Sequence, residues 1–260
     1  MRLGEYLWKK KRGKIVMGDL FKTGVRPLID EYIDTKRKEK RDYGDYWSAS
    51  SAGYCMRKNI FERLGVPHST ADEARLQRVF ESGHIFHSWV QGITKDSGLS
   101  VASEDELIDD DLMVKGHFDD IVKVDDKLIL YDYKTVSSMS FKYSVGRPMS
   151  VFHRMQLGTY MYMLRKGKYP ELDESRILKI SKDDLRMHED QLIWTESLEK
   201  DVVGYWKTLN GYWKRKQLPN CTCADFEGGF MAKERYNPFY YNGEPCSLAW
   251  FAKEGVDSWS

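Results

Sequence analysis

Apolar and polar positions follow two different periods along this chain, and each period predicts a different kind of element. Between residues 72 and 95, apolar side chains recur at the spacing of an amphipathic helix. The residues on this stripe are Leu76, Val79, Phe80, Gly83, Phe86 and Val90. His87 lies on the same stripe, which places a polar ring on a face that is otherwise apolar.

Strand-like alternation follows this helix and predicts a central sheet. We expect strands near 99–107, 112–124, 127–135 and 175–181, and further helices near 19–40, 56–65, 150–166 and 196–216. The order helix, three strands, helix, strand is typical of a mixed sheet with helices packed against it, in an α/β or α+β arrangement. We expect three regions: a basic, helical N-terminal segment (1–45), a core (46–195), and a C-terminal helix and cysteine-containing segment (196–260). This last region either folds back or forms a small subdomain.

The strand at 127–135 carries charge on a face that begins apolar. Alternate side chains of a strand share a face, so Leu128, Leu130, Asp132 and Lys134 point the same way. Burying an unpaired carboxylate or ammonium is costly. Asp132 and Lys134 must therefore emerge at an edge of the sheet, pair with each other, or hold a cation.

The preceding strand supplies more carboxylates. Gly116 is followed by Asp119 and Asp120, and a hairpin through residues 124–127 would bring one of these two carboxylates close to Asp132. Oxygen ligands of this kind are what Mg²⁺ and Mn²⁺ prefer. The strand period alone does not decide between Asp119 and Asp120.

These residues resemble the core of the PD-(D/E)XK nuclease superfamily, in its RecB-like branch. The resemblance begins with G-x-x-D at 116–119 followed by "DYKT" at 132–135, and three further motifs extend it over 48–164. "ESGHIFHSWV" contains Gly83 and His87, "HRMQLGTYMYML" contains Gln156 and Tyr160, and "SASSAGYCMRKNIFERLG" precedes the histidine helix. The same motifs are similar to those of CRISPR-associated and phage exonucleases that carry an iron-sulfur cluster.

The resemblance implies a restriction-endonuclease-like fold and a set of site residues. The spacing from Gly116 favours Asp119 over Asp120. The implied catalytic residues are Asp119, Asp132, Lys134, Gln156 and Tyr160. The implied ligands of Mg²⁺ or Mn²⁺ are His87, Asp119, Asp132 and the backbone carbonyl of Tyr133. The expected DNA contacts are Arg57, His153, Arg154 and Tyr160. In the helix expected at 150–166, His153, Gln156 and Tyr160 lie on one face.

Four cysteines suggest a second metal site. Cys55, Cys221, Cys223 and Cys246 are too few and too unevenly spread for a secreted disulfide scaffold. The resemblance implies a 4Fe-4S cluster, with one ligand before the histidine helix and three near the C-terminus. The C-T-C spacing and the long gap before Cys246 depart from the usual C-x-x-C pattern. Zinc, with a histidine such as His68 or His188, and free thiols remain alternatives.

Composition limits the remaining function classes. Forty-one basic and forty acidic side chains leave a net charge of +1, so any nucleic-acid site must be a local patch. The basic runs at 9–14 and 36–41 form either solvated faces or a phosphate-contacting arm. No segment is apolar enough for a membrane span or a secretory signal, which predicts a cytoplasmic protein of a bacterium or a phage-infected host. The G-x-x-x-x-G-K-[ST] motif of nucleotide-driven motors is absent.

These observations lead us to expect a metal-dependent DNA exonuclease acting on single-stranded or frayed ends. Its expected setting is phage or bacterial DNA recombination, replication or repair, with a helicase or recombinase as a separate partner protein. A structure-specific or restriction-type endonuclease is one alternative. A non-catalytic DNA-binding or assembly factor with a nuclease fold is the other.

Overall fold

The computed structural model describes residues 25, 28–29, 31–33, 43–66, 68, 73–225, 233, 237–241 and 243–248 of the chain. The described residues fall into two compact units, one within 1–41 and 72–81 and the other within 42–71 and 82–260. The basic runs at 9–14 and 36–41 lie outside the described residues, as does most of the helix expected at 19–40. The few described positions in that helix are helical.

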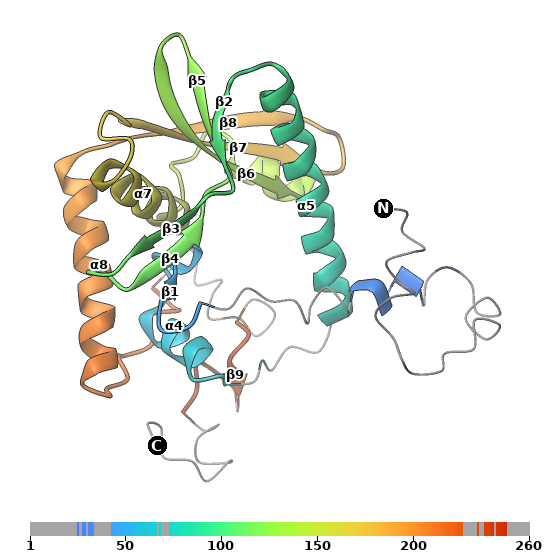
Figure 1. The fold of residues 1–260 in the computed structure, drawn as a ribbon. Coiled ribbons are helices and arrows are strands. Elements are labelled where there is room, and N and C mark those ends of the chain that lie inside the picture. The colour runs from blue at the N-terminus through green and yellow to red at the C-terminus, as the bar shows by residue number, and fades with distance from the viewer. Residues whose placement is uncertain are drawn as a thin grey trace, which may run out of the picture. The chain divides into compact units, whose positions relative to one another are not determined.

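A five-stranded mixed sheet forms the centre of the larger unit, as the alternation predicted (Figure 1). Its order is β2-β5-β6-β7-β8, with bounds Ser100–Ser103, Asp120–Val124, Lys127–Val136, Glu174–Ser181 and Met187–Ile193. Strands β6 and β7 pair in parallel, and every other neighbouring pair is antiparallel. The parallel pair requires a crossover, which the helices between residues 138 and 166 provide.

The predicted hairpin joins β5 to β6. Val124 pairs with Lys127, so the turn consists of Asp125 and Asp126 alone. Both residues have positive φ, +48° and +66°, which is the backbone that a two-residue type I′ turn requires. The turn fixes the register, and with it the face on which each residue of β6 lies.

The strands predicted at 99–107 and 112–124 are each divided in two, so their expected continuity was wrong. Strands β3 (Glu106–Asp109) and β4 (Val114–His117) join β1 (Trp47–Ser48) in a second sheet of order β1-β4-β3. Phe118 is buried in the main core between β4 and β5. The chain thus changes sheets at Phe118 and Asp119, which turns Asp119 away from a regular strand.

The two faces of the central sheet are covered by different helices (Figure 1). Helix α7 (Val151–Lys166) packs on the face of Leu130 and Ile177, together with α8 (Glu196–Lys214). A Cβ on Gly158 would lie 2.9 Å from side-chain atoms of Leu198 and Val202, so glycine permits this close helix contact. Residues 82–96 of α5 (Glu73–Asp96) cover the opposite face through Phe86 and Val90.

Short elements complete the unit. Helix α4 (Met56–Arg63) ends before Gly65, whose φ is +69°, as its sequence predicted. Helix α6 (Ser138–Ser144), the 3₁₀ turn Ala49–Ser51 and strand β8 were not expected. The hairpin of β9 (Tyr240–Tyr241) and β10 (Glu244–Pro245) lies in a C-terminal segment that packs Phe239 and Cys246 against Phe61 of α4. The C-terminal segment therefore folds back onto the N-terminal part, as expected.

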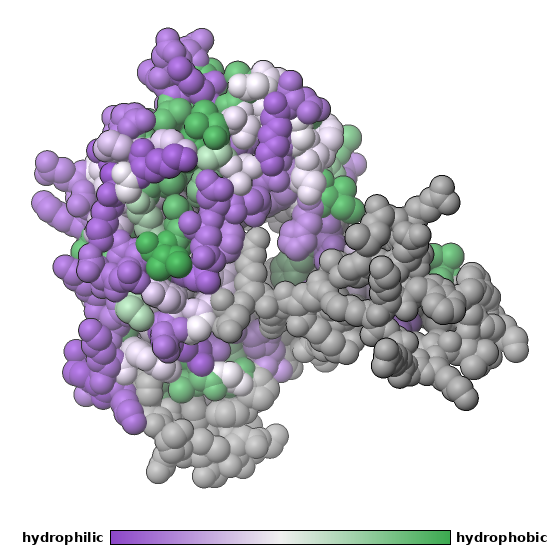
Figure 2. All heavy atoms as spheres, in the orientation of Figure 1, coloured by the Kyte–Doolittle hydropathy of each residue, from purple (hydrophilic) through white to green (hydrophobic). Residues whose placement is uncertain are grey.

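The surface is mixed in character. Figure 2 shows hydrophilic residues interspersed with apolar patches over the described part of the face in view. No helix among the described residues has the length and apolar character needed to cross a bilayer.

Candidate active site and metal centre

Asp132 and Lys134 of β6 pair with each other, which accounts for charge on an otherwise apolar strand face. Lys134 Nζ lies 3.0 Å from Asp132 Oδ1 and 2.9 Å from Oδ2. Asp132 is buried, and Gln156 Nε2 of α7 donates to the same Oδ1 at 3.0 Å. The face of β6 that begins apolar thus ends in a carboxylate held by one ammonium and one amide.

Asp119 lies beside this pair, at the point where the chain passes from one sheet to the other. Its Oδ2 accepts a hydrogen bond from the backbone N–H of Tyr133 at 2.7 Å. Nδ1 of His87, on α5, is 3.4 Å from the same oxygen. Gln91, one helical turn after His87, donates to the Asp119 carbonyl at 2.9 Å and to Glu104 Oε1 at 3.0 Å. Two elements therefore fix the Asp119 backbone and side chain.

Asp120 has a different environment, which separates it from Asp119. It is fully buried and accepts hydrogen bonds from three hydroxyls. Thr94 Oγ1 is at 2.6 Å, Ser100 Oγ at 2.7 Å and the Tyr133 hydroxyl at 3.0 Å. A carboxylate satisfied in this way is a structural anchor between α5 and the sheet. Asp119 is the one of the two that adjoins His87 and the Asp132–Lys134 pair.

The electrostatics of the site favour a bound cation. Burial, with the adjacent charge of Asp132, raises the pKa of Asp119 to about 8, although Lys134 opposes the shift. Burial and the nearby Lys134 lower the pKa of His87, so its imidazole is neutral at pH 7 and keeps a lone pair. Burial lowers the Lys134 pKa, but the carboxylates of Asp132 and Asp119 outweigh it and the net pKa is raised. Ionisation of Asp119 would place two buried carboxylates beside one ammonium, and a divalent cation would relieve their repulsion.

The residues present fit Mg²⁺ or Mn²⁺. Apart from its ion pair with Lys134, Oδ2 of Asp132 is buried without a hydrogen-bond partner. Carboxylate oxygens and a neutral imidazole are suitable ligands for these ions. These donors are more spread than the thiols described below, since among the described residues only the four cysteines bring their ligand atoms within 4.8 Å of one another.

Tyr160 and Gly116 pack against each other next to the site. A Cβ on Gly116 would lie 2.9 Å from Tyr160 Cε1 and 2.8 Å from the Ala49 side chain. Glycine at this position therefore makes room for the tyrosine ring. Tyr160 is buried, and burial raises the pKa of its phenol, which stays protonated at neutral pH.

The expected DNA contacts have several protein partners. Arg57 donates to the carbonyls of Pro219 at 2.7 Å and Cys246 at 3.5 Å, so it holds the C-terminal segment. Arg154 pairs with Asp201 of α8 at 2.7 Å. Burial lowers the pKa of His153 to about 4, which makes its ring neutral. Contacts of these residues with DNA remain predictions.

A second buried ion pair, not expected from the sequence, lies on the same face of the sheet. Lys179 of β7 is the direct neighbour of Lys134 in the parallel register, and it pairs with Asp190 of β8. Asp190 also lies 3.1 Å from His188 Nε2. The only sequence signal was the lysine within the apolar run "RILKIS". His188 thus contacts Asp190, and the group of four sulfur ligands does not include it or His68.

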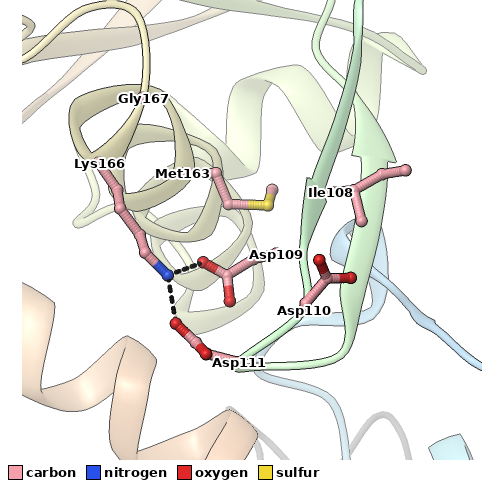
Figure 3. Close-up of a pocket in the computed structure, with 7 residues that line it drawn as sticks. All are labelled: Ile108, Asp109, Asp110, Asp111, Met163, Lys166 and Gly167. Carbon is pink, nitrogen blue, oxygen red and sulfur yellow. Dashed lines mark hydrogen bonds and ion pairs between the residues drawn. The ribbon is translucent and has the colours of Figure 1, made fainter.

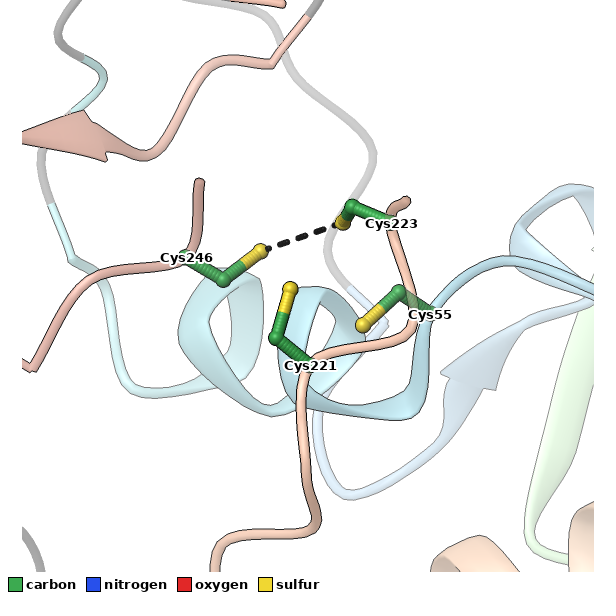
Figure 4. A group of neighbouring side chains, drawn as sticks. All are labelled: Cys55, Cys221, Cys223 and Cys246. Carbon is green, nitrogen blue, oxygen red and sulfur yellow. Dashed lines mark hydrogen bonds between the residues drawn. The ribbon is translucent and has the colours of Figure 1, made fainter. Parts of the chain in front are cut away.

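The four cysteines converge although Cys55 is far from the others in sequence (Figure 4). Their sulfur atoms all lie within 4.8 Å of one another, with Cys223 and Cys246 at 3.6 Å. The Thr222 N–H donates to Cys55 at 3.4 Å, and Asn237 Nδ2 donates to Cys223 at 3.4 Å. Hydrogen bonds from the neighbouring thiols hold the pKa of Cys55 below its usual range. Four thiol ligands in this arrangement fit a metal site.

A pocket of about 320 Å³ lies elsewhere, at the C-terminal end of α7 (Figure 3). Lys166 Nζ spans its acidic rim, at 2.9 Å from Asp109 Oδ2 and 2.6 Å from Asp111 Oδ2. Lys166 follows Gln156 by nearly three helical turns, roughly 15 Å along the axis. This pocket is therefore separate from the candidate active site.

Comparisons with known proteins agree with the fold. The family model described as the PD-(D/E)XK nuclease superfamily matches residues 59–221. No curated protein matches the chain. The crystal structure of SSO0001 is 16% identical, covers 74% of this chain and 86% of its own, and has a TM-score of 0.50.

Two exonuclease structures are more distant. An alkaline exonuclease from Laribacter hongkongensis is 12% identical, with coverage of 66% of this chain and 93% of its own and a TM-score of 0.42. A phage-related exonuclease from Haemophilus somnus 129PT is also 12% identical. The match covers 62% of this chain and 80% of that protein's chain, with a TM-score of 0.41.

Proposed function

The chain belongs to the PD-(D/E)XK nuclease superfamily, and from this premise we propose that it is a divalent-metal-dependent DNA exonuclease acting on single-stranded or frayed ends. The observation that carries the proposal is the convergence of His87 and Asp119 beside the paired Asp132 and Lys134. Three elements of the chain, α5, the sheet junction and β6, supply these groups. A histidine, two aspartates and a lysine are residue types suited to the hydrolysis of a phosphodiester with the help of a divalent ion.

Each side chain has a distinct role in this proposal. His87, Asp119, Asp132 and the Tyr133 carbonyl would hold Mg²⁺ or Mn²⁺, which would supply Lewis-acid activation of the scissile phosphate and of water. Lys134 stays protonated, because its carboxylate neighbours raise its pKa, and it stabilises negative charge on a phosphate oxygen. Gln156 orients Asp132 through its hydrogen bond. Tyr160, neutral at pH 7, is a hydrogen-bond donor to the DNA strand.

Exonuclease action on DNA ends rests on the motifs over 48–164 that resemble those of CRISPR-associated and phage exonucleases. The proposed setting is DNA recombination, replication or repair in the cytoplasm of a bacterium or phage-infected host, with a separate helicase or recombinase as partner. We assign Arg57, His153, Arg154 and Tyr160 to DNA contacts within this proposal.

The cysteine site is proposed to hold a 4Fe-4S cluster of structural function. Four buried or half-buried sulfurs that join residues 55 and 246 would anchor the C-terminal segment to α4. Zinc bound by the same four thiolates is the alternative, and metal analysis of anaerobically purified protein together with its visible absorption distinguishes the two.

The activity is tested with end-labelled linear single-stranded DNA and covalently closed circles in parallel, in Mg²⁺ or Mn²⁺. We expect loss of the linear substrate only, abolished in Lys134→Ala and His87→Ala. Lys123→Ala is the matched control, because Lys123 is an exposed lysine on the neighbouring strand β5. Cleaved circles would favour an endonuclease. Folded protein that cleaves neither substrate would leave a DNA-binding factor.

A further inference from the structure

The segment just before Cys55 is packed tightly on the N-terminal half of α7. Gly53 has a φ of +76°, and a Cβ there would lie 3.0 Å from Met155 Cβ and 3.1 Å from the Val151 carbonyl. A larger residue would be strained in its backbone and would clash with the helix. The backbone that leads into the first cysteine therefore has little freedom to move independently of α7.

Tyr54 continues this contact with its ring. The ring stacks on Phe152 of α7, with centroids 4.5 Å apart and an interplanar angle of 21°. Its carbonyl accepts a hydrogen bond from the Tyr205 hydroxyl of α8 at 2.9 Å. Tyr54 is thus held at both its backbone and its side chain.

From Phe152, one face of α7 and two side-chain contacts lead to the Asp132–Lys134 pair. Phe152 and Gln156 are four residues apart on α7, so they occupy the same face of the helix. Gln156 donates to Asp132, which pairs with Lys134. Burial raises the pKa of the Tyr54 phenol while the charge of Lys134 opposes the shift, so the two groups lie within each other's electrostatic range.

At its other end Tyr54 is joined to the sulfur cluster. Cys55 is the next residue, and Lys58 Nζ lies over the Tyr54 ring at 4.2 Å. Burial lowers the pKa of Lys58, whereas Glu62 and the thiolates of Cys246, Cys223 and Cys55 raise it. Lys58 is therefore a cation shared between the aromatic ring and the cysteine cluster.

We propose that Tyr54 is a positioning residue that links the four-cysteine site to the Asp132–Lys134 pair. An ion held by the four sulfurs fixes Cys55, which fixes the Tyr54 ring against Phe152 and hence the helix turn that carries Gln156. Loss of that ion loosens residues 53–55, and the orientation of Asp132 becomes less well defined. This inference rests on the proposed function for its effect on cleavage, but the structural link exists without it.

The first test does not depend on activity. Amide hydrogen exchange of the peptides covering 151–157 and 131–135 is measured in the full chain, before and after removal of the sulfur-bound ion by a chelator. We expect faster exchange in both peptides after removal in the wild type. In Tyr54→Ala exchange is already fast and removal adds little. Equal exchange in the wild type with and without the ion would overturn the proposal.

The second test uses cleavage kinetics as a double-mutant cycle. Removal of the ion should reduce the single-turnover rate roughly tenfold in the wild type and by much less in Tyr54→Ala, because coupled changes are not additive. Tyr54→Phe keeps the ring and should behave as the wild type. Tyr143→Ala, which removes an exposed tyrosine on α6, is the matched control. Additive losses would overturn the coupling, whereas inactivity of the wild type would instead refute the proposed function.

Discussion

The four-cysteine cluster and the carboxylate site are both suited to metal ions, but they are built in opposite ways. In the cluster, four like ligands lie within 4.8 Å of one another. In the carboxylate site, Asp132 is held by Lys134 and Gln156, and Asp119 is held by the Tyr133 amide and faces His87. A closed ligand set is typical of a structural site, whereas a catalytic site keeps a coordination position open for water or substrate.

The two sites also differ in what holds them together. The cysteines come from the N-terminal end of α4 and from a C-terminal segment with little regular structure, so the ion itself would supply much of the stability. The carboxylates lie on a sheet between α5 and α7, and the core positions them regardless of the ion. Changes to the first site should therefore alter stability most, with a smaller effect on cleavage that passes through Tyr54, whereas changes to the second should alter chemistry.

The largest expected effect is on cleavage, at Asp132. In Asp132→Asn the shape is kept and the charge is lost, so Asp119 remains as the charged neighbour of Lys134 and the divalent ion loses a ligand. We expect the cleavage rate to fall by about 10³-fold or more while the melting temperature changes little. Single-turnover cleavage measures the rate and thermal melting measures the stability. Calorimetry of Mn²⁺ binding tests whether the ligand has been lost. A large drop in melting temperature would contradict the view that the carboxylate site serves chemistry and the cluster serves stability.

A smaller effect, on stability, is expected when a cysteine of the cluster is replaced. Cys223 is fully buried, and Cys223→Ser should abolish metal binding by the thiols and destabilise the chain by about 3 kcal/mol, which lowers the melting temperature by roughly 10 °C. Metal analysis and calorimetry measure these changes. The wild type stripped of its sulfur-bound ion is the control and should melt at the same temperature. An unchanged melting temperature with the ion lost would contradict a structural role.

The next effect in size is expected in the pH dependence of stability, which reports on Asp119 in the carboxylate site. The folded-state pKa of Asp119 is raised to about 8 from 3.8, so its contribution to stability is present near pH 4 and is lost as the pH rises through 8. Without added divalent cations, stability should fall over this range by roughly 1–3 kcal/mol.

Mg²⁺ should reverse the loss at pH 8, and Asp119→Asn should flatten the curve. Thermal melts at a series of pH values measure it. Asp120→Asn is the comparison variant, because its carboxylate is satisfied by three hydroxyls, and it should destabilise the fold instead. A wild-type slope that persists in Asp119→Asn would assign the titration to another group.

The smallest effect is expected at the acidic pocket, which lies outside both sites. Lys166→Ala removes an exposed ion pair with Asp111 and a pair with the buried Asp109, whose other oxygen still accepts from the Leu112 N–H, so we expect a loss of about 1 kcal/mol and unchanged cleavage. Thermal melting and the linear-DNA assay check this. A strong loss of cleavage would show that the C-terminal end of α7 takes part in the reaction.

Local patterns in the sequence were enough for the main elements. The alternation over 127–135 and the turn at Asp125–Asp126 predicted the hairpin, because strand period and turn geometry are set by neighbouring residues. The apolar stripe of α5 is local in the same sense. Strand β1 was not predictable in this way, because its partner β4 is distant in sequence, and β8 has too few apolar residues to show a clear alternation.

The sequence by itself thus determined which residues share a face of β6 and which residue types are available for the chemistry. Only the tertiary structure showed how the two differ in environment, because three hydroxyls satisfy Asp120 and His87 adjoins Asp119. It also decided that Cys55 meets Cys246. The alternation of side chains along a strand is a property of the backbone. The burial of a side chain and its hydrogen-bond partners depend on the packing of the whole chain.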